Sequence, residues 1–244
     1  MRLIVLAAGY ATRLYPLTLE RPKALLDVAG RPMLEHVLER LEPAGIDATT
    51  VVTNSKFAAA FAEWENGSRF QATVLDDGTS SEADKRGAIG DIAFVLAEEQ
   101  IDDDVIVVAG DNLFSEDLGD FGRAAREIAA PLLAVYDVGD LEAIREYNAI
   151  DVDSAGRITF FEEKPLQPTS TLTGIALYFY PRASLAEIGR YVAEGNNPDQ
   201  PGRLVQWLYL QTAVYTWRVP GIWYDVGSAE SLAEADRVFS ALRS

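Results

Sequence analysis

The sequence contains no cysteine and a single histidine, His36. Without cysteine the chain can form no disulfide bond, no thiolate zinc site and no cysteine nucleophile. This absence is compatible with a cytoplasmic protein, which is the location we expect. His36 lies in the segment MLEHVLERL, whose apolar residues recur with helical spacing. We therefore expect it to be a surface or packing residue rather than a metal ligand.

Long apolar runs and an excess of positive charge are also missing. No apolar stretch approaches the length of a transmembrane helix, and the N-terminus lacks the basic flank and cleavage site of a signal peptide. The formal net charge is −17. Because nucleic acids and anionic membranes bind basic surfaces, we expect neither as a partner. Self-association into a homo-oligomer is compatible with the sequence.

Apolar runs rich in β-branched residues alternate with segments of helical period through the first half of the chain. The expected strands are residues 2–7, 49–53, 70–75, 105–109 and 131–136. The expected helices between them are residues 32–44, 56–65, 87–99 and 116–129. This alternation predicts an α/β fold, with a Rossmann-like, doubly wound, mixed but mostly parallel sheet that carries helices on both faces.

The pattern changes after residue 140. The segment AIDVDSAGRITFFEEKP predicts a hairpin that turns at Asp153–Gly156 and continues as a strand to Phe161. Further strands are expected at residues 171–180, 213–218 and 222–225, and helices at 182–194, 203–210 and 229–242. No interdomain linker separates the two patterns. We therefore expect a single domain over residues 1–244, made of a half 1–140 and a small, β-rich half 141–244.

The first predicted strand leads into a loop that combines small and basic residues. The segment LIVLAAGYATRLYPLTLERPKALLDVAG, residues 3–30, leaves the strand at Ala7-Ala8-Gly9 and then carries Arg13 and Lys23. Ligands of open α/β sheets bind beyond the carboxyl ends of the strands, where this loop begins. Small residues allow backbone N–H groups to approach a ligand closely, and the two cations favour an anion. The chain has neither G-x-x-x-x-G-K-[ST] nor G-x-G-x-x-G, so it is neither a P-loop protein nor a dinucleotide-binding unit by motif.

The stretch LAAGYATRLYPLTLERPKALLDVAGRPML resembles the signature of the sugar-phosphate nucleotidylyltransferases, also called nucleotide-sugar pyrophosphorylases. Three later stretches resemble the same family in the expected order: VVVAGDNLF, FFEEKP and WYDVGSAESLAEA. The resemblance covers nearly the whole chain in a short, single-domain form. One departure is Ala11, which stands where the family usually has a second glycine.

The resemblance implies roles for particular residues. Arg13, Lys23 and Asp111 would be catalytic, and Asp111 and Asp225 would bind Mg²⁺. The implied sugar-phosphate-binding residues of the second half are Tyr147, Asn148, Glu162, Lys164 and Gly174, together with Lys23. The implied nucleotide-binding residues are Leu6, Ala7, Ala8, Gly9, Ala11, Thr12, Arg13, Gly87 and Asp111.

The chemistry of the family explains these residue types. A nucleoside triphosphate and a sugar 1-phosphate are both strongly anionic, so catalysis depends mainly on positioning and charge neutralisation. Arg13 can bind the β- and γ-phosphates with its planar donors, and Lys23 supplies a point charge near the α-phosphate. Lys164 would hold the sugar phosphate, and Glu162 would accept hydrogen bonds from sugar hydroxyls. Two carboxylates suit Mg²⁺, which takes few protein ligands; the alternative is that Asp111 and Asp225 are turn or helix-capping residues.

Two segments depart from the family pattern and leave the substrates open. Tyr147–Asn148 stands where many relatives have Tyr-Gly, so the sugar pocket is expected to differ. In SSEADKRGAIGDI, Gly87 can offer its backbone to the base, but no glutamine precedes it in that loop. Glu82, Asp84 or a main-chain carbonyl could replace that glutamine.

Three alternatives accompany this interpretation. The same fold could transfer a cytidylyl group to a phosphoalcohol such as phosphocholine, which Asn148 keeps open and the Glu162–Lys164 pair opposes. A non-catalytic nucleotide-sensing subunit would be expected to have lost Arg13, Lys23 or a metal-binding aspartate. A glycosyltransferase should carry D-x-D after a strand, whereas residues 102–104 precede one.

Overall fold

A computed structural model of the chain describes residues 1–242. Its centre is a seven-stranded sheet in the order β12-β8-β11-β6-β1-β4-β5. Strand β11 pairs antiparallel with β6 and β8, and every other pairing in this sheet is parallel. The predicted mixed, mostly parallel α/β sheet is therefore confirmed. The strands of this sheet are β1 (Arg2–Leu6), β4 (Ala48–Thr53), β5 (Thr73–Asp76), β6 (Val105–Ala109), β8 (Leu132–Asp137), β11 (Leu172–Tyr180) and β12 (Tyr215–Arg218).

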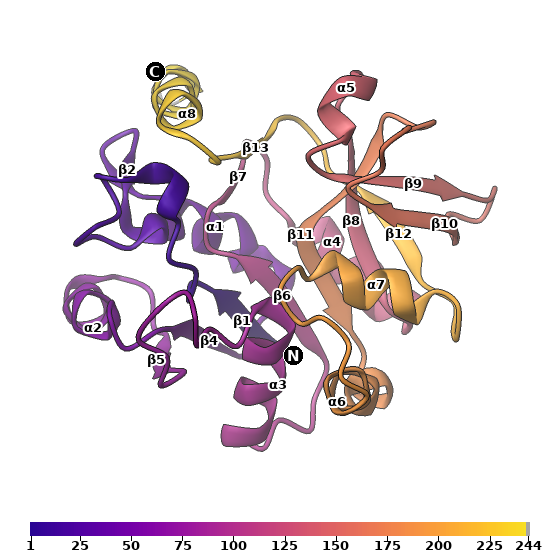
Figure 1. Ribbon diagram of the computed structural model, residues 1–244, viewed down its shortest axis with the longest axis horizontal. Coiled ribbons are helices and arrows are strands. Elements are labelled where there is room, and N and C mark those ends of the chain that lie inside the picture. The colour runs from indigo at the N-terminus through magenta and orange to yellow at the C-terminus, as the bar shows by residue number, and fades with distance from the viewer. Residues whose placement is uncertain (243–244) are drawn as a thin grey trace.

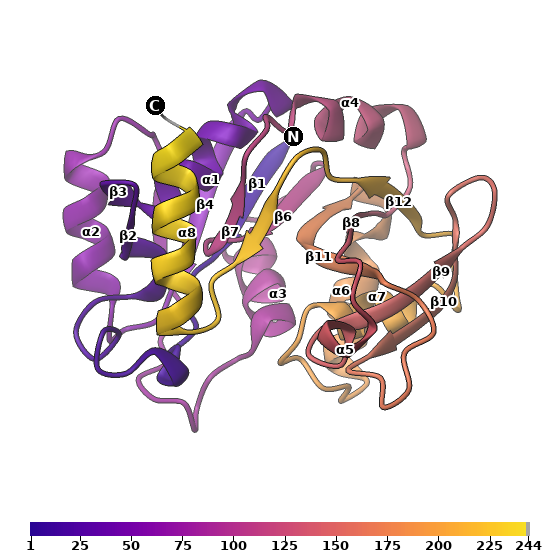
Figure 2. The ribbon, with the colours of Figure 1, turned by 90° about the horizontal axis from the view of Figure 1, so that it is seen from above.

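Helices cover both faces of the sheet, as the sequence predicts. Figure 2 shows α1 and α4 on one side and α3, α6 and α7 on the other. The side chains of each strand alternate between two buried clusters: in β1, Leu3 and Val5 belong to one and Ile4 to the other. This alternation is the period-2 geometry of a strand buried on both faces. The helices are α1 (Met33–Leu41), α2 (Ala58–Gly67), α3 (Ala88–Glu98), α4 (Gly119–Ile128), α5 (Leu141–Ile144), α6 (Leu185–Ala193), α7 (Gly202–Leu208) and α8 (Ala229–Leu242).

Outside the main sheet, the described residues 1–242 form three two-stranded ribbons. The predicted hairpin is β9 (Asn148–Val152) paired with β10 (Ile158–Glu163), and it lies beside β11 (Figure 1). Strand β7 (Asn112–Phe114) pairs antiparallel with β13 (Trp223–Asp225). Strand β2 (Asp27–Val28) pairs with β3 (Arg31–Pro32). Within residues 1–242, 3₁₀ helices span Thr12–Leu14, Lys23–Leu25, Glu42–Ala44 and Arg182–Ser184.

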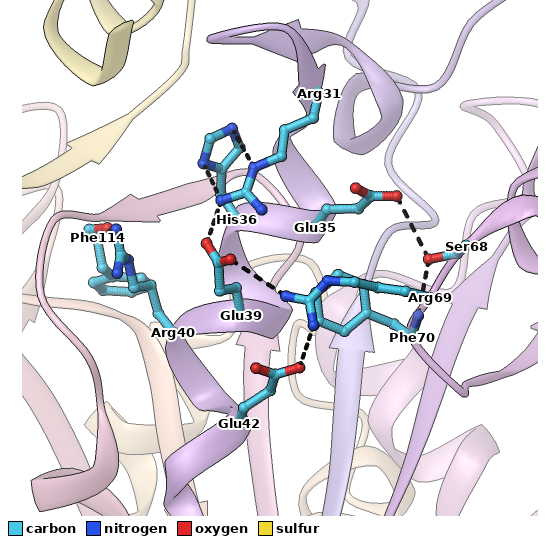
Figure 3. A network of polar contacts seen from close by, with 10 residues as sticks. All are labelled: Arg31, Glu35, His36, Glu39, Arg40, Glu42, Ser68, Arg69, Phe70 and Phe114. Atoms are coloured by element: carbon cyan, nitrogen blue, oxygen red, sulfur yellow. Dashed lines mark hydrogen bonds and ion pairs between the residues drawn. The ribbon is translucent and has the colours of Figure 1, made fainter. Parts of the chain in front are cut away.

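The C-terminal helix returns to the N-terminal part of the chain, where α8 packs beside β2 (Figures 1 and 2). Phe239 of α8 meets the ring of His36 edge to face, with the ring centroids 6.0 Å apart. The His36 Nε2–H donates to the carbonyl of Val28 at 2.7 Å, and the Arg31 guanidinium lies against the same ring. Arg31 also pairs with Glu39, which Arg69 joins to Glu42 (Figure 3). His36 is buried within this network, which agrees with the predicted packing role.

The expected elements differ from the observed ones mainly at their ends. The predicted helix 32–44 stops at Leu41 and continues as the 3₁₀ turn Glu42–Ala44, because Pro43 has no N–H for an α-helical hydrogen bond. The predicted strand 70–75 begins only at Thr73, where pairing with Thr50 of β4 starts. No helix within residues 1–242 combines the length and the apolar character that crossing a membrane requires.

Two helical glycines provide a test of the packing. A Cβ on Gly122 of α4 would lie 2.2 Å from the carbonyl oxygen of Ala44, so the helix can approach the Glu42–Ala44 turn only without a side chain. A Cβ on Gly189 of α6 would meet no atom of residues 1–242 within 4 Å, apart from its chain neighbours and the backbone of its own helix. We expect Gly122→Ala to lower the free energy of unfolding by about 1–3 kcal/mol through overpacking. Gly189→Ala should raise it by about 0.5–1 kcal/mol, because alanine is the better helix former.

Urea unfolding of the two variants beside the parent chain measures both effects. Equal free energies of unfolding for Gly122→Ala and the parent chain would contradict the close contact between α4 and the turn.

Candidate functional site

A cleft of about 520 Å³ opens at the carboxyl ends of β1 and β6. All the predicted nucleotide-binding residues line it, from Leu6 at the end of β1 to Asp111 after β6, and so do Lys23 and Asp225. The topology thus brings together residues that are more than two hundred positions apart in the sequence. The residues predicted for the sugar phosphate in the second half are outside this lining within residues 1–242.

The loop after β1 is held by hydrogen bonds to the end of β4 and to the residue that follows it. The Ala7 N–H donates to the carbonyl of Val52 at 2.9 Å, and the Asn54 amide donates to the carbonyl of Ala8 at 2.7 Å. Ala11 has a left-handed backbone conformation with φ 48°, and the Thr18 hydroxyl donates to its carbonyl at 2.8 Å. A left-handed residue favours glycine, which explains physically why the family's signature has glycine at this position. The exposed Arg13 follows within the 3₁₀ turn Thr12–Leu14.

Lys23 lies at the centre of the cleft beside two carboxylates. Its Nζ is 2.5 Å from Oδ2 of Asp111, and its side chain is 17% exposed. The negative charges of Asp111 and Asp225 both stabilise its ammonium group, and the positive charge of Arg13 opposes them. Pro22 precedes Lys23 and caps the short turn Lys23–Leu25, which fixes where the long side chain leaves the backbone.

Two short strands bring the aspartates together. Strand β7 begins directly after Asp111, and in its ladder with β13 Asn112 pairs with Asp225. Paired residues of antiparallel strands have Cα atoms about 4.5–5.5 Å apart, so this register places Asp225 beside the residue that follows Asp111. The Asn112 side chain adds to this order: its Nδ2 donates to Oδ1 of Asp111 at 3.1 Å, and its Oδ1 accepts from Nε1 of Trp223 at 2.7 Å.

The charges of the three groups are strongly interdependent. Burial opposes the charged form of Lys23, but the carboxylates of Asp111 and Asp225 outweigh this effect and raise its pKa. Burial likewise opposes ionisation of Asp111, yet the ammonium of Lys23 lowers the pKa of that carboxyl. Burial and the charge of Asp111 raise the pKa of Asp225 to about 6. The ammonium of Lys23 thus interacts with two carboxylates, and it compensates the negative charge of Asp225 only partly.

This donor set fits a magnesium ion. Asp111 and Asp225 offer carboxylate oxygens, the ligand type that Mg²⁺ prefers, and they lie in an open cleft where water and phosphate oxygens can complete an octahedron. The negative charges of both carboxylates stabilise the ammonium of Lys23, so the two side chains are close enough to act on one cation. Burial and the negative charge of Asp111 raise the pKa of Asp225, so additional positive charge nearby would favour its ionised form.

The second half approaches the site through Tyr147. Its ring packs edge to face on Trp223 at a centroid distance of 5.6 Å. Burial and the neighbouring charge of Asp225 raise the pKa of Tyr147. Lys164 is joined to it, because the Lys164 N–H donates to the Tyr147 carbonyl at 2.8 Å. Lys164 is exposed and has a left-handed backbone conformation, with φ 49°.

The other predicted sugar-phosphate residues have different surroundings. The side-chain amide of Asn148 forms two hydrogen bonds with the backbone of Gly174. Its Oδ1 accepts from the Gly174 N–H at 2.6 Å, and its Nδ2 donates to the Gly174 carbonyl at 3.0 Å. It therefore joins β9 to the irregular part of β11. Glu162 is exposed on β10, whereas Glu163 is half-buried against Gly202 and its Oε2 has no hydrogen-bond partner within residues 1–242. Burial raises the pKa of Glu163.

Sequence reasoning missed three further acidic residues of the cleft: the half-buried Asp199, and Asp77 and Asp91. Asp77 follows β5, and Asp91 lies in the first turn of α3. Both are almost fully buried. A signal for Asp91 was present in the sequence, because a charged residue interrupts the apolar helical segment GAIGDIAFVL.

Comparisons with known proteins agree with this geometry. The chain is 30% identical over 180 residues to the UTP–glucose-1-phosphate uridylyltransferase AglF of Haloferax volcanii, covering 74% of this chain and 72% of that protein. It is 30% identical over 241 residues to a glucose-1-phosphate thymidylyltransferase of Mycolicibacterium smegmatis, covering 96% and 81%. A solved structure of UDP-glucose pyrophosphorylase complexed with UDP-glucose has the same fold, with a TM-score of 0.82, 21% identity and 98% of both chains covered.

The match to a whole family is broader than the match to any of these proteins. Residues 2–240 fit the family whose members are described as nucleotidyl transferases. That range includes the loop after β1, Lys23 and both aspartates. The chain therefore belongs to the nucleotidyl transferase family.

Proposed function

We propose that the protein transfers a nucleotidyl group from a nucleoside triphosphate to a sugar 1-phosphate, releasing pyrophosphate and forming a nucleotide-sugar. The observation that carries the proposal is the position of Lys23, which lies in the cleft after β1 between the carboxylates of Asp111 and Asp225. The names of the similar proteins suggest glucose 1-phosphate as the first acceptor to test, with UTP or dTTP as the donor.

The reaction joins two anions. A phosphate oxygen of the sugar phosphate attacks the α-phosphorus of the triphosphate, the bond between that phosphorus and the bridging oxygen breaks, and pyrophosphate leaves with the bond's electrons. The protein supplies no nucleophile, so its role is to align the two phosphates and to offset their repulsion. Lys23 can contact the α-phosphate and the attacking phosphate, and the exposed Arg13 can reach the leaving pyrophosphate.

Asp111 and Asp225 would hold Mg²⁺. When bound, the ion would neutralise phosphate charge and act as a Lewis acid at the reacting phosphate. The hydrogen bond from Asn112 keeps the carboxylate of Asp111 in a fixed orientation. Such an outer contact commonly increases the affinity of a metal site.

The acceptor would enter from the side of the second half. Tyr147 lies near Asp225 on that side, and Lys164 is hydrogen-bonded to the Tyr147 backbone. The ammonium of Lys164 is proposed to bind the sugar phosphate as it approaches Lys23. Glu162 is proposed to accept hydrogen bonds from the sugar, with Asn148 and Gly174 forming the floor of the pocket. The alternative, cytidylyl transfer to a phosphoalcohol such as phosphocholine, was kept open by Asn148. The side-chain amide of Asn148 is hydrogen-bonded to the backbone of Gly174, so this residue no longer favours that alternative. A cytoplasmic location stays a prediction.

Pyrophosphate release tests the reaction directly. The purified protein is incubated with Mg²⁺, each common nucleoside triphosphate, and a panel of sugar 1-phosphates and phosphoalcohols. Release that requires one triphosphate and one sugar 1-phosphate is the expected result. Release only with a phosphoalcohol, or none at all while nucleotides still bind, would contradict the proposal.

Replacing Lys23 tests its role as a charge at the reacting phosphates. We expect Lys23→Ala to lower kcat by about 10²–10³, the usual loss on removing one preorganised charge-stabilising contact. Lys56→Ala is the matched control, because Lys56 is exposed and lies over the rings of Tyr15 and Phe57. A loss of less than about threefold for Lys23→Ala, equal to the control, would contradict its assigned role.

Replacing Asp225 tests the magnesium site. We expect Asp225→Asn to weaken the apparent affinity for Mg²⁺ by at least about 10–100-fold, the loss seen for outer contacts of metal sites. Titration of Mn²⁺ followed by electron paramagnetic resonance measures this binding without turnover. Asp151→Asn, which removes an exposed carboxylate on β9, should bind the ion as the parent chain does. Unchanged Mn²⁺ binding in Asp225→Asn would remove this residue from the metal site.

A further inference from the structure

A buried indole on β13 is linked by hydrogen bonds to a carboxylate of the cleft. Trp223 is 9% exposed, and its Nε1–H donates to Oδ1 of Asn112 at 2.7 Å. Asn112 is 4% exposed, and its Nδ2 donates in turn to Oδ1 of Asp111 at 3.1 Å. The three side chains therefore form one continuous series of hydrogen bonds that ends on Asp111.

The chemistry of its two ends fixes the direction of this series. An indole N–H can only donate, so the atom of Asn112 that faces Trp223 is its oxygen. Asp111 is paired with the ammonium of Lys23 through Oδ2, and an ionised carboxylate can only accept, so the group that faces Oδ1 is the N–H₂. The amide of Asn112 has a single orientation that satisfies both neighbours.

The indole of Trp223 is held by aromatic rings from two other segments. Its ring centroid lies 5.6 Å from that of Tyr136 of β8, with the planes tilted by 53°, and 5.6 Å from that of Tyr147, edge to face. Its backbone lies opposite Phe114 in the ladder with β7. The direction of the N–H group is consequently fixed by the main sheet, by the ribbon and by the second half of the chain.

This support matters because it orients one carboxylate at both of its oxygens. Lys23 lies 2.5 Å from Oδ2 of Asp111, and Asn112 donates to Oδ1. Without the N–H of Trp223, the buried oxygen of Asn112 would lose its donor, which is unfavourable. The amide could then turn over and bring its oxygen against the carboxylate, which would repel it.

We propose that Trp223 is a positioning residue of the metal site: its indole N–H, acting through the amide of Asn112, sets the orientation of the Asp111 carboxylate. The proposal rests on the metal-binding role of Asp111 proposed above and extends it to a side chain two hydrogen bonds away. Partners that orient the ligands of a metal commonly increase the affinity of its site.

Four variants separate the N–H group from the ring that carries it. Trp223→Phe keeps an aromatic ring and removes the N–H, and Asn112→Leu has a similar volume and removes the amide. The third variant combines these two substitutions. Trp207→Phe is the matched control, because Trp207 packs edge to face on Tyr191 at 5.6 Å, beside the buried cluster on the other face of the sheet. Titration of Mn²⁺ followed by electron paramagnetic resonance, without substrates, measures metal binding in each protein.

The effects of the two substitutions should not add. We expect Trp223→Phe to weaken Mn²⁺ binding by about 3–10-fold, the value of one net hydrogen bond. Asn112→Leu should weaken it by about 10–100-fold. Adding Trp223→Phe to Asn112→Leu should cause no further loss, because the group through which the N–H acts is then missing. Trp207→Phe should bind the ion as the parent chain does.

The indole resonance of Trp223 reports the hydrogen bond itself, without metal. In ¹⁵N-labelled protein this resonance is the one that disappears in Trp223→Phe. Asn112→Leu should shift it and leave that of Trp207 in place. Asn112→Ala replaces the leucine variant in both measurements if urea unfolding shows that the latter is not folded.

Three outcomes would overturn the inference: a parent chain that binds no Mn²⁺, unchanged binding in Trp223→Phe, and an equal loss from Trp223→Phe with and without Asn112. The last result would mean that the indole acts only by packing. Failure of the proposed reaction is distinguishable. The expected pattern of Mn²⁺ affinities without pyrophosphate release would contradict the reaction and support the positioning role, whereas release with unchanged Mn²⁺ binding in Trp223→Phe would do the reverse.

Discussion

The arrangement of the cleft depends on one electrostatic constraint: a single ammonium group, that of Lys23, is surrounded by the carboxylates of Asp111 and Asp225. In a chain with a net charge of −17, anionic ligands can bind only where cations are concentrated and held in place. Lys23 is fixed by the Pro22 turn and by its short contact with Asp111. Because the two carboxylates outnumber the ammonium, further positive charge would stabilise the site, and the proposed Mg²⁺ ion would supply it.

The fold meets this constraint by joining segments from both ends of the chain. Lys23 comes from the loop after β1, Asp111 follows β6, and Asp225 ends β13. The ladder between β7 and β13 fixes the distance between the aspartates, and Asn112 with Trp223 stabilises its register. Helix α8 follows β13 and packs against β2, so the C-terminal segment is anchored beyond the ladder as well. The chemistry of the cleft thus depends on a ribbon of two short strands outside the main sheet.

The two sides of the cleft treat their acidic residues differently. Beside Lys23, ionised carboxylates face a cation. On the nucleotide side, Asp77 and Asp91 are buried, Asp77 accepts hydrogen bonds from Thr79, and burial together with the charge of Asp77 raises the pKa of Asp91 to about 8. Acidic residues can therefore provide charge in one part of the site and neutral hydrogen-bonding groups in another. The difference arises from burial and from the distance to Lys23 rather than from residue type.

The sequence alone determined the class of fold and the position of the first loop. Apolar runs such as 105–109 and the helical periods between them predict the sheet and its covering helices, because both patterns are local. The position of the loop at a strand end indicated an anion site, because strand ends meet at one edge of the sheet. The two aspartates were identified through the resemblance of their segments to the nucleotidylyltransferase signature. The sequence also held an unused signal on β10: Phe161 is apolar and points inward, so the alternation of a strand turns Glu163 inward and Glu162 outward.

Only the tertiary structure decided which side chains are left for a ligand. The sequence suggests Asn148 as a residue of the sugar pocket, yet its side-chain amide is hydrogen-bonded to the backbone of Gly174. Glu82 and Asp84 look like free acceptors, yet Lys85 and two serines bind them. Asp91 is buried beside Asp77, a residue fourteen positions away, and no local pattern reveals that contact. Hydrogen-bond partners and burial are set by segments distant in the chain, and the sequence specifies them only through the complete fold.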